Sequence, residues 1–203
     1  MNIRTVEYVG TVANAGGPIP GTLPQVAFSG RSNVGKSSLI NTVLRRTRSK
    51  VARVSATPGK TRAINFFSVN EHFYLVDLPG YGYAKVPQSV RDAWGELIEW
   101  YLAESGNVRG VVHLVDARRD VTAHDLQMVN YLAELEIPAL IVLTKMDKLK
   151  TSQRDAAIAR TCTQLEVGDD QLVPFSSKTG EGRDTLLEAL ESLLSDSEED
   201  APA

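Results

Sequence analysis

The chain of 203 residues has a single cysteine and no long hydrophobic run. One cysteine can form neither an internal disulfide nor a thiolate zinc site, so the sequence is typical of a reducing compartment. The longest uninterrupted apolar run, "IPALIVL", is far too short to cross a bilayer. The N-terminal stretch "MNIRTVEYVGTVANAGG" lacks the apolar segment of a signal peptide. We therefore expect a cytoplasmic protein that does not associate with membranes.

Acidic residues are absent between Tyr8 and Asn70, although the whole chain has a formal net charge of −3. This window contains nine cations and has a charge of +9, so the rest of the chain has a charge of −12. Solvated charges can cluster by chance, but an asymmetry of this size favours an anionic partner on one side of the molecule. The nine cations are Arg31, Lys36, Arg45, Arg46, Arg48, Lys50, Arg53, Lys60 and Arg62.

Apolar strand patterns alternate with helical patterns along most of the chain. Strands are predicted at 23–28, 63–69, 72–78, 108–116, 138–145 and 172–177, and apolar residues at helical spacing follow or separate most of them. The pattern predicts an α/β fold, with a mostly parallel six-stranded sheet, one antiparallel edge strand and helices on both faces. We divide the chain into an N-terminal extension (1–22), one domain (23–195) and an acidic, disordered tail (196–203).

The segment "GRSNVGKSS" fulfils the P-loop pattern G-x-x-x-x-G-K-[ST], between an apolar strand and an amphipathic helix. Its glycines allow backbone N–H groups to surround phosphate oxygens at the N-terminus of the helix. The lysine supplies a charge near the β- and γ-phosphates, and the serine hydroxyl can bind Mg²⁺. The sequence therefore predicts a nucleoside triphosphate site whose phosphate-binding residues are Gly30, Arg31, Ser32, Asn33, Val34, Gly35, Lys36, Ser37 and Ser38.

A second motif, "DLPG", follows the predicted strand at 72–78. In P-loop proteins a carboxylate at the end of a neighbouring strand holds Mg²⁺, which is the role predicted for Asp77. Gly80, at D-x-x-G spacing, can offer its backbone N–H to the γ-phosphate. A loop held only through the γ-phosphate is released after hydrolysis, so the motif also predicts a conformational switch.

The segment "LTKMD" at the end of a strand favours guanine as the base. The carboxylate of Asp147 can accept hydrogen bonds from N1–H and the N2 amine of guanine, whereas adenine offers neither donor. Binding of ATP would leave that carboxylate unpaired, which excludes an ATP-dependent kinase as the preferred interpretation. The stem of Lys145 can lie against the ring. The remaining predicted base-binding residues are Thr144, Ser176, Ser177 and Lys178.

These motifs in this order are typical of a GTPase domain of the Ras-like P-loop class. Over residues 20 to 195 the chain further resembles the EngB (YihA) family, which belongs to the TrmE–Era–EngA–EngB–septin group. The resemblance rests on the segments "GRSNVGKSSLIN", "TPGKTRAINFF", "DLPGYGYAKV", "TKMD" and "FSS". The resemblance implies a slow GTPase that acts late in assembly of the large (50S) ribosomal subunit and supports cell growth. It also implies that Thr61 binds Mg²⁺ together with Ser37, although spacing alone does not separate Thr61 from Thr57.

Two residues, Thr144 and Tyr81, depart from the Ras pattern: Thr144 stands where the commoner guanine motif has asparagine, so base affinity should be modest. Tyr81 follows D-x-x-G directly, where Ras has its water-orienting glutamine, so we hypothesise that tyrosine replaces glutamine and that hydrolysis is slow. Asn33 occurs in other GTPases that bind K⁺ beside the phosphates, and we hypothesise the same here; the alternative is that Asn33 only braces the loop. The predicted catalytic residues are Asn33, Lys36, Thr61 and Gly80. His113, within the strand pattern "VVHLV", is interpreted as a core residue.

The partner is predicted from the charge asymmetry. Seven of the nine cations have no predicted role in nucleotide binding. They surround the Thr57–Thr61 segment, called switch I from here on, where ribosomal RNA phosphates would attract them. We expect a monomer that binds the large subunit or its precursor in the GTP state. The alternative is a GTP-dependent switch that docks on a protein partner, for instance in cell division.

Overall fold

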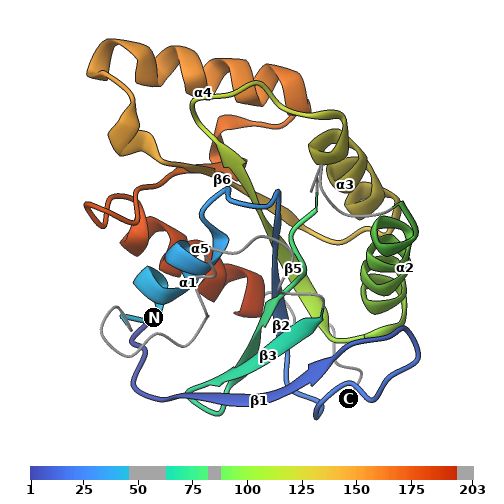
Figure 1. The fold of residues 1–203 in the computed structure, drawn as a ribbon. Helices are drawn as coiled ribbons and strands as arrows, with labels where there is room; N and C mark the ends of the chain where they lie inside the picture. The colour runs from blue at the N-terminus through green and yellow to red at the C-terminus, as the bar shows by residue number, and fades with distance from the viewer. Residues whose placement is uncertain (46–62, 82–87, 196–203) are drawn as a thin grey trace.

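The computed structural model describes residues 1–45, 63–81 and 88–195, with the backbone alone for residues 88–94. One seven-stranded sheet in the order β1-β3-β4-β2-β5-β6-β7 forms the centre of the molecule (Figure 1). Its strands are β1 (Val6–Val12), β2 (Gln25–Gly30), β3 (Ile64–Val69), β4 (Phe73–Asp77), β5 (Val108–Asp116), β6 (Ala139–Thr144) and β7 (Leu172–Pro174). The strands β4, β2, β5, β6 and β7 are parallel neighbours.

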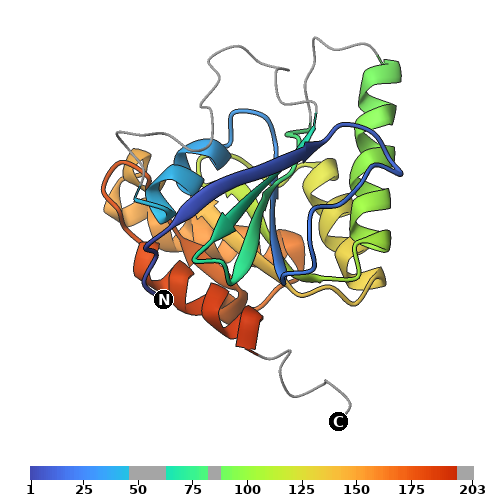
Figure 2. The ribbon, with the colours of Figure 1, turned by 90° about the horizontal axis from the view of Figure 1, so that it is seen from below.

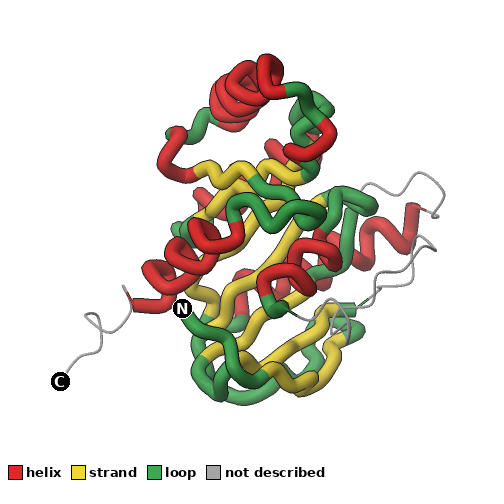
Figure 3. The backbone as a smooth tube through the Cα atoms, turned by 90° about the vertical axis from the view of Figure 1, so that its left-hand side faces the viewer, coloured by secondary structure: helices red, strands yellow, loops and turns green. Residues whose placement is uncertain are grey.

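Helices cover both faces of the sheet, which confirms the predicted α/β class (Figure 1). Successive side chains of a strand point to opposite faces. In β2, Phe28 packs with α1 (Lys36–Val43) and α5 (Arg183–Ser195), whereas Ala27 packs with α2 (Gln88–Glu104) and α3 (Ala123–Glu134). Because both faces are covered, all six residues of β2 are buried. The helix α4 (Thr151–Leu165) packs on β6 at the far end of the sheet (Figure 3).

The sheet has one strand more than the six predicted, because β1 lies in the segment that we set aside as an N-terminal extension. β1 pairs antiparallel with β3, and β3 in turn pairs antiparallel with β4. Figure 2 shows β1 crossing the edge of the sheet. The Asn70 side chain fixes this arrangement: its Oδ1 accepts from the backbone N–H groups of Arg4 and Thr5, and its Nδ2 donates to the carbonyl of Asn2.

The predicted hairpin of β3 and β4 is confirmed. Its turn places Asn70 and Glu71 at positive φ angles of 53° and 58°, and the N–H of His72 donates to the carbonyl of Val69. Two central residues at positive φ are the mark of a type I′ turn, whose twist matches that of the strands. Within the described residues, no helix combines the length and apolarity that a membrane crossing requires.

Candidate active site

The P-loop connects β2 to α1. Gly30 has a φ of 153°, and a Cβ atom there would lie 3.0 Å from the carbonyl oxygen of Leu114. Gly35, at a φ of 115°, is the N-cap of α1 and gives the helix no side-chain acceptor. The first N–H groups of a helix have no partner inside it, so this end of α1 is built to receive an anion.

A buried ion pair joins the P-loop to β4. Lys36, the first residue of α1, donates from Nζ to Asp77 Oδ1, and both side chains are less than 10% exposed. Asp77 ends β4 and lies beside Phe28 of β2, so the fold itself brings the carboxylate to the P-loop. The two groups predicted to hold phosphate and Mg²⁺ are thus in direct contact.

The oxygen atoms at this position suit a magnesium ion. Mg²⁺ prefers oxygen ligands and is commonly held by one carboxylate together with a hydroxyl and substrate phosphates. The carboxylate of Asp77 and the hydroxyl of Ser37, the residue after Lys36, belong to that donor class. Thr61, the third predicted ligand, and its alternative Thr57 lie outside the described residues.

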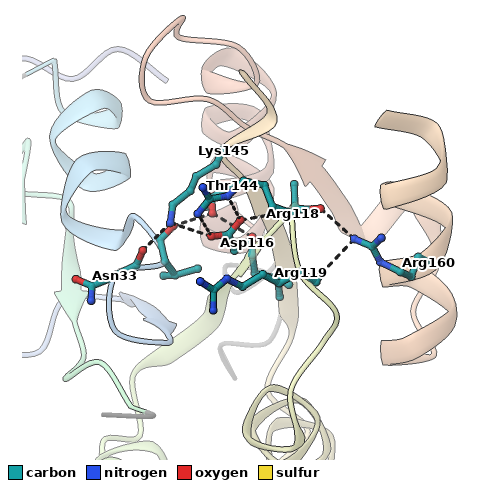
Figure 4. Close-up of polar contacts among 10 residues, drawn as sticks. Asn33, Asp116, Arg118, Arg119, Thr144, Lys145 and Arg160 are labelled. Atoms are coloured by element: carbon teal, nitrogen blue, oxygen red, sulfur yellow. Dashed lines mark hydrogen bonds and ion pairs between the residues drawn. The ribbon is translucent and has the colours of Figure 1, made fainter. Parts of the chain in front are cut away.

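The base-motif residues of β6 connect three parts of the site (Figure 4). The Thr144 hydroxyl lies within hydrogen-bond distance of two backbone carbonyls, those of Val34 (2.8 Å) and Val115 (3.1 Å). Lys145, at a φ of 64°, donates from Nζ to the carbonyl of Asn33 at 2.6 Å. Thr144 therefore connects the end of β6 to the P-loop and to β5, through contacts that do not involve a base.

The residue that sequence reasoning missed is Asp116, the last residue of β5. Its Oδ2 accepts from Lys145 Nζ at 2.9 Å, and its two oxygens accept from Arg118 Nε and Nη2 at 2.9 and 2.8 Å (Figure 4). Burial alone would raise the pKa of Asp116, but donation by Arg118 and Lys145 outweighs it and holds the pKa well below its usual range. Asp116 therefore remains ionised and orients Lys145 across the site.

The loop after Asp116 is itself held in place from α4. Arg160 donates from Nη2 to the carbonyls of Ala117 (3.0 Å) and Arg119 (3.2 Å), as Figure 4 shows. Arg160 also forms an ion pair with Asp120. The loop that presents Arg118 is thus fixed at both sides of that residue.

Asp147 and Ser176, which are both predicted to bind the base, are hydrogen-bonded to each other. Ser176 donates from Oγ to Asp147 Oδ1 at 2.9 Å, and Ser176 Oγ accepts from the N–H groups of Lys178 and Thr179, both at 3.2 Å. Burial would raise the pKa of Asp147, but donation by Ser176 and the charge of Lys148 hold it below its ordinary value. Ser177, between Ser176 and Lys178, belongs to the same loop after β7. An ionised carboxylate at this position can accept from two donors on one base edge.

The segment Gly80–Tyr81 lies directly against the P-loop. Ser32 donates from its backbone N–H to the carbonyl of Tyr81 at 2.9 Å and from Oγ to the carbonyl of Gly80 at 3.2 Å. The phenol of Tyr81 instead reaches α3, where it donates to Asp125. This placement differs from our hypothesis that the tyrosine stands in for the water-orienting glutamine.

Several predicted residues cannot be placed. Of the seven cations assigned to an RNA contact, only Arg45 is described, and it is exposed. The other six are Arg46, Arg48, Lys50, Arg53, Lys60 and Arg62; like Thr61, they lie outside the described residues.

His113 is fully buried as predicted, but it belongs to a polar cluster with Tyr81.

Three parts of the site meet at one edge of the sheet. They are the P-loop after β2, the carboxylate at the end of β4 and the base motif at the ends of β6 and β7. Ligands of open α/β sheets bind at this edge, outside the carboxyl ends of the strands. The fold and the site together define a nucleotide-binding protein of the P-loop GTPase class.

Comparison with known proteins agrees with this class. The family model described as 50S ribosome-binding GTPase matches residues 25–145, and the elongation factor Tu GTP binding domain matches residues 103–196. A probable GTP-binding protein EngB of Gemmatimonas aurantiaca is 49% identical over 195 residues, which cover 96% of this chain and 95% of that protein. The chain therefore belongs to the EngB family of GTP-binding proteins.

Solved structures share the fold. The crystal structure of a probable GTP-binding protein EngB is 27% identical, with a TM-score of 0.70 over 85% of this chain and 99% of that chain. Era, solved in complex with MgGDPNP and nucleotides 1506–1542 of 16S ribosomal RNA, is 22% identical, with a TM-score of 0.61 over 85% of this chain and 57% of that chain. The likeness to Era extends to the fold alone.

Proposed function

We propose that this protein binds GTP, hydrolyses it slowly and uses the GTP state to act in late assembly of the large ribosomal subunit in the cytoplasm. The proposal rests chiefly on one observation: the P-loop with Lys36 and Asp77 lies at the same sheet edge as the Asp147–Ser176 pair. In an EngB-family chain, this combination supports a site for one guanine nucleotide. The protein is then required for normal growth, and its loss also affects cell division.

Base selection falls to Asp147. Its ionised carboxylate accepts from N1–H and N2–H of guanine, and Ser176 keeps the carboxylate oriented from the other side. Adenine offers neither donor, so the side of this carboxylate that faces the base would lose both hydrogen bonds, which costs several kcal/mol. Thr144 contributes to base binding indirectly, because its hydroxyl donates to the carbonyl of Val34 in the P-loop.

Phosphate binding and hydrolysis fall to the other end of the site. Lys36 and the α1 N-terminus neutralise the phosphates, and Gly80 offers its N–H to the terminal phosphate. Ser37, Asp77 and Thr61 would hold Mg²⁺, which supplies charge neutralisation on the phosphate oxygens. Since the phenol of Tyr81 is bonded to Asp125, we expect unassisted turnover on the order of 10⁻⁴ to 10⁻³ s⁻¹.

We further propose that Asn33 helps to bind K⁺ beside the phosphates. Its positive φ of 66° and the bond from Lys145 to its carbonyl fix the backbone of this residue within the P-loop. Turnover of GTP in matched K⁺ and Na⁺ buffers tests this role. Faster turnover in K⁺ supports it, and equal rates remove Asn33 from the mechanism.

The proposed partner is the large ribosomal subunit or its precursor. The window from Tyr8 to Asn70 holds nine cations and no acidic residue, which favours contact with RNA phosphates around switch I. The matching family model is described as a ribosome-binding GTPase, which supports the same partner. A protein partner, for example in cell division, remains the second candidate, because an acidic protein surface would attract the same cations.

Co-sedimentation of the purified protein with large-subunit precursors tests the proposal. We expect binding with a non-hydrolysable GTP analogue, little binding with GDP, a steep loss with added salt and sensitivity to RNase. Lys36→Ala, which removes the phosphate-binding cation, is the matched control and should sediment poorly with either nucleotide. Equal binding in both nucleotide states would contradict GTP gating, and RNase-resistant binding would favour the protein partner.

A further inference from the structure

Tyr81 inserts its side chain into a polar socket formed by Ser29, His113, His124 and Asp125. The phenol donates to Asp125 Oδ1 at 2.5 Å and lies 3.2 Å from His113 Nε2. Its ring stacks on the imidazole rings of His113 and His124, with centroid distances of 6.1 Å in both pairs. The residue directly after D-x-x-G is thus held by side chains from β5 and α3.

Ser29, His113 and Asp125 form the buried part of the socket, whereas His124 is exposed. Ser29 Oγ lies 2.8 Å from His113 Nδ1, and both residues are at most 1% exposed. Asp125 Oδ2 accepts from the N–H and the hydroxyl of Thr122, the N-cap of α3, at 2.8 and 2.6 Å. An imidazole that accepts from Ser29 at Nδ1 and donates from Nε2 gives a hydrogen-bond partner to each of the buried side chains Ser29, His113 and Asp125. Such a hydrogen-bonded network favours one arrangement of its members.

The protonation states in the socket fix the direction of the central hydrogen bond. Burial, the charge of Asp125 and the bond to Asp125 raise the pKa of the Tyr81 phenol far above its ordinary value. Donation by His113, Thr122 and Tyr81 outweighs burial and holds the pKa of Asp125 well below its usual range. Tyr81 therefore remains a neutral donor and cannot serve as a base toward water.

The backbone of the same residue is bound to the P-loop on the other side. Ser32 donates to the carbonyls of Gly80 and Tyr81, and a Cβ atom added to Gly80 would lie 3.2 Å from Ser32 Oγ. The side chain of Tyr81 points to the α2–α3 face of the sheet, where Ala27 and Val111 also pack, whereas α1 covers the opposite face. Gly80 thus lies between two fixed points, Ser32 and the socket.

We propose that Tyr81 is a positioning residue: its phenol, held in the socket, fixes the Gly80 N–H for contact with the terminal phosphate of GTP. Tyr81 then contributes to the preference for GTP over GDP and leaves the orientation of the attacking water to other groups. This inference deepens the proposed function and rests on the assignment of Gly80 to the terminal phosphate. GDP lacks that phosphate, so its affinity should be independent of Tyr81.

Nucleotide affinities of the full chain test the proposal without any ribosomal particle. Tyr81→Phe keeps the ring and deletes the hydroxyl that donates to Asp125. We expect it to weaken binding of a non-hydrolysable GTP analogue roughly fivefold or more, with GDP affinity unchanged, because linked sites typically change affinity by that much. Tyr81→Gln should show the same loss and no faster GTP hydrolysis.

Tyr101→Phe is the matched control. Tyr101 is also buried and donates to a buried acceptor, Gln25 Oε1 at 2.7 Å, but it lies at the opposite end of β2. This variant should lose stability and keep both affinities. Equal weakening of GTP analogue and GDP by Tyr81→Phe, no weakening at all, or faster hydrolysis by Tyr81→Gln would each overturn the proposal.

Gly80→Ala separates this proposal from the proposed function. If Gly80→Ala reduces the GTP preference and Tyr81→Phe does not, the positioning role falls while the role of Gly80 stands. If neither variant changes the preference, the positioning role falls. Loss of preference in both variants supports both roles.

Discussion

The two ends of the nucleotide site are held together by different kinds of contact. At the base end, Thr144 and Lys145 bond to backbone carbonyls, and Asp116 holds Lys145 from β5. At the phosphate end, Lys36 and Asp77, the groups assigned to phosphate and Mg²⁺, bond to each other. The base end is therefore preorganised by protein contacts, whereas Mg²⁺ and the phosphates must compete with an internal ion pair.

The largest effect on stability is expected at the phosphate end. Lys36→Ala removes one partner of a buried pair and leaves the Asp77 carboxylate uncompensated, which should cost about 3 kcal/mol of the free energy of unfolding. Urea denaturation without nucleotide measures this change. In the double variant with Asp77→Ala, most of the loss should be recovered, because no charge then remains buried without a partner. If the double variant is as unstable as the single one, the ion pair is not what joins α1 to β4.

A smaller effect is expected at the base end. Asp116→Asn weakens the bonds to Lys145 and Arg118 and should cost about 2 kcal/mol near neutral pH. The control is Asp120→Asn in the same loop, where an exposed pair with Arg160 should contribute less than about 1 kcal/mol. Urea denaturation of both variants checks the difference, and equal losses would contradict the anchoring role of Asp116.

The Asp116 contribution should also depend on pH with a definite sign. The pKa of Asp116 is lower in the folded chain than in the unfolded chain, so its ionised form stabilises the fold above the unfolded pKa. The difference in stability between wild type and Asp116→Asn should be constant near neutral pH. It should shrink as the pH falls below about 4 and through the folded pKa. A difference that persists unchanged in acid would argue against this ion pair.

The smallest effect is expected from the Thr144 hydroxyl. Thr144→Val should cost about 1 kcal/mol, because it removes the hydroxyl that bonds to the carbonyls of Val34 and Val115. Thr161→Val is the control, since this buried hydroxyl bonds to Ala157 within α4. Both variants should lose similar stability in thermal unfolding, but only Thr144→Val should weaken GDP binding. If neither variant changes the affinity for GDP, the Thr144 hydroxyl does not help to hold the P-loop in its binding conformation.

Much of the site could be predicted from the sequence because its chemistry is local. Nine consecutive residues, Gly30 to Ser38, form the P-loop, and a strand followed by a carboxylate marks both Asp77 and Asp147. Asp116 carries the same signal, a carboxylate after the apolar run of β5, and could have been found in this way. The fold class followed from the alternation of buried strands and amphipathic helices.

The remaining features depend on contacts between distant parts of the chain. The socket of Tyr81 joins Ser29 to His113, 84 residues apart, and Tyr81 to Asp125, 44 residues apart. No local pattern reports such a network. β1 was missed because most of its residues are exposed, so the strand lacks the apolar alternation on which the prediction relied. Its pairing with β3 depends on the backbone ladder and on the Asn70 side chain, which is more than 60 residues away along the chain from the residues that it bonds.

The strand β1 also has a consequence for how one molecule meets another. It forms one rim of the sheet, and its register with β3 shifts between Tyr8 and Gly10, while β7, at the opposite rim, has only three residues. A long, straight border of free N–H and C=O groups invites a neighbouring molecule to add its own strand. Neither rim provides such a border, so crowded molecules of this protein should remain separate rather than join into a continuous sheet.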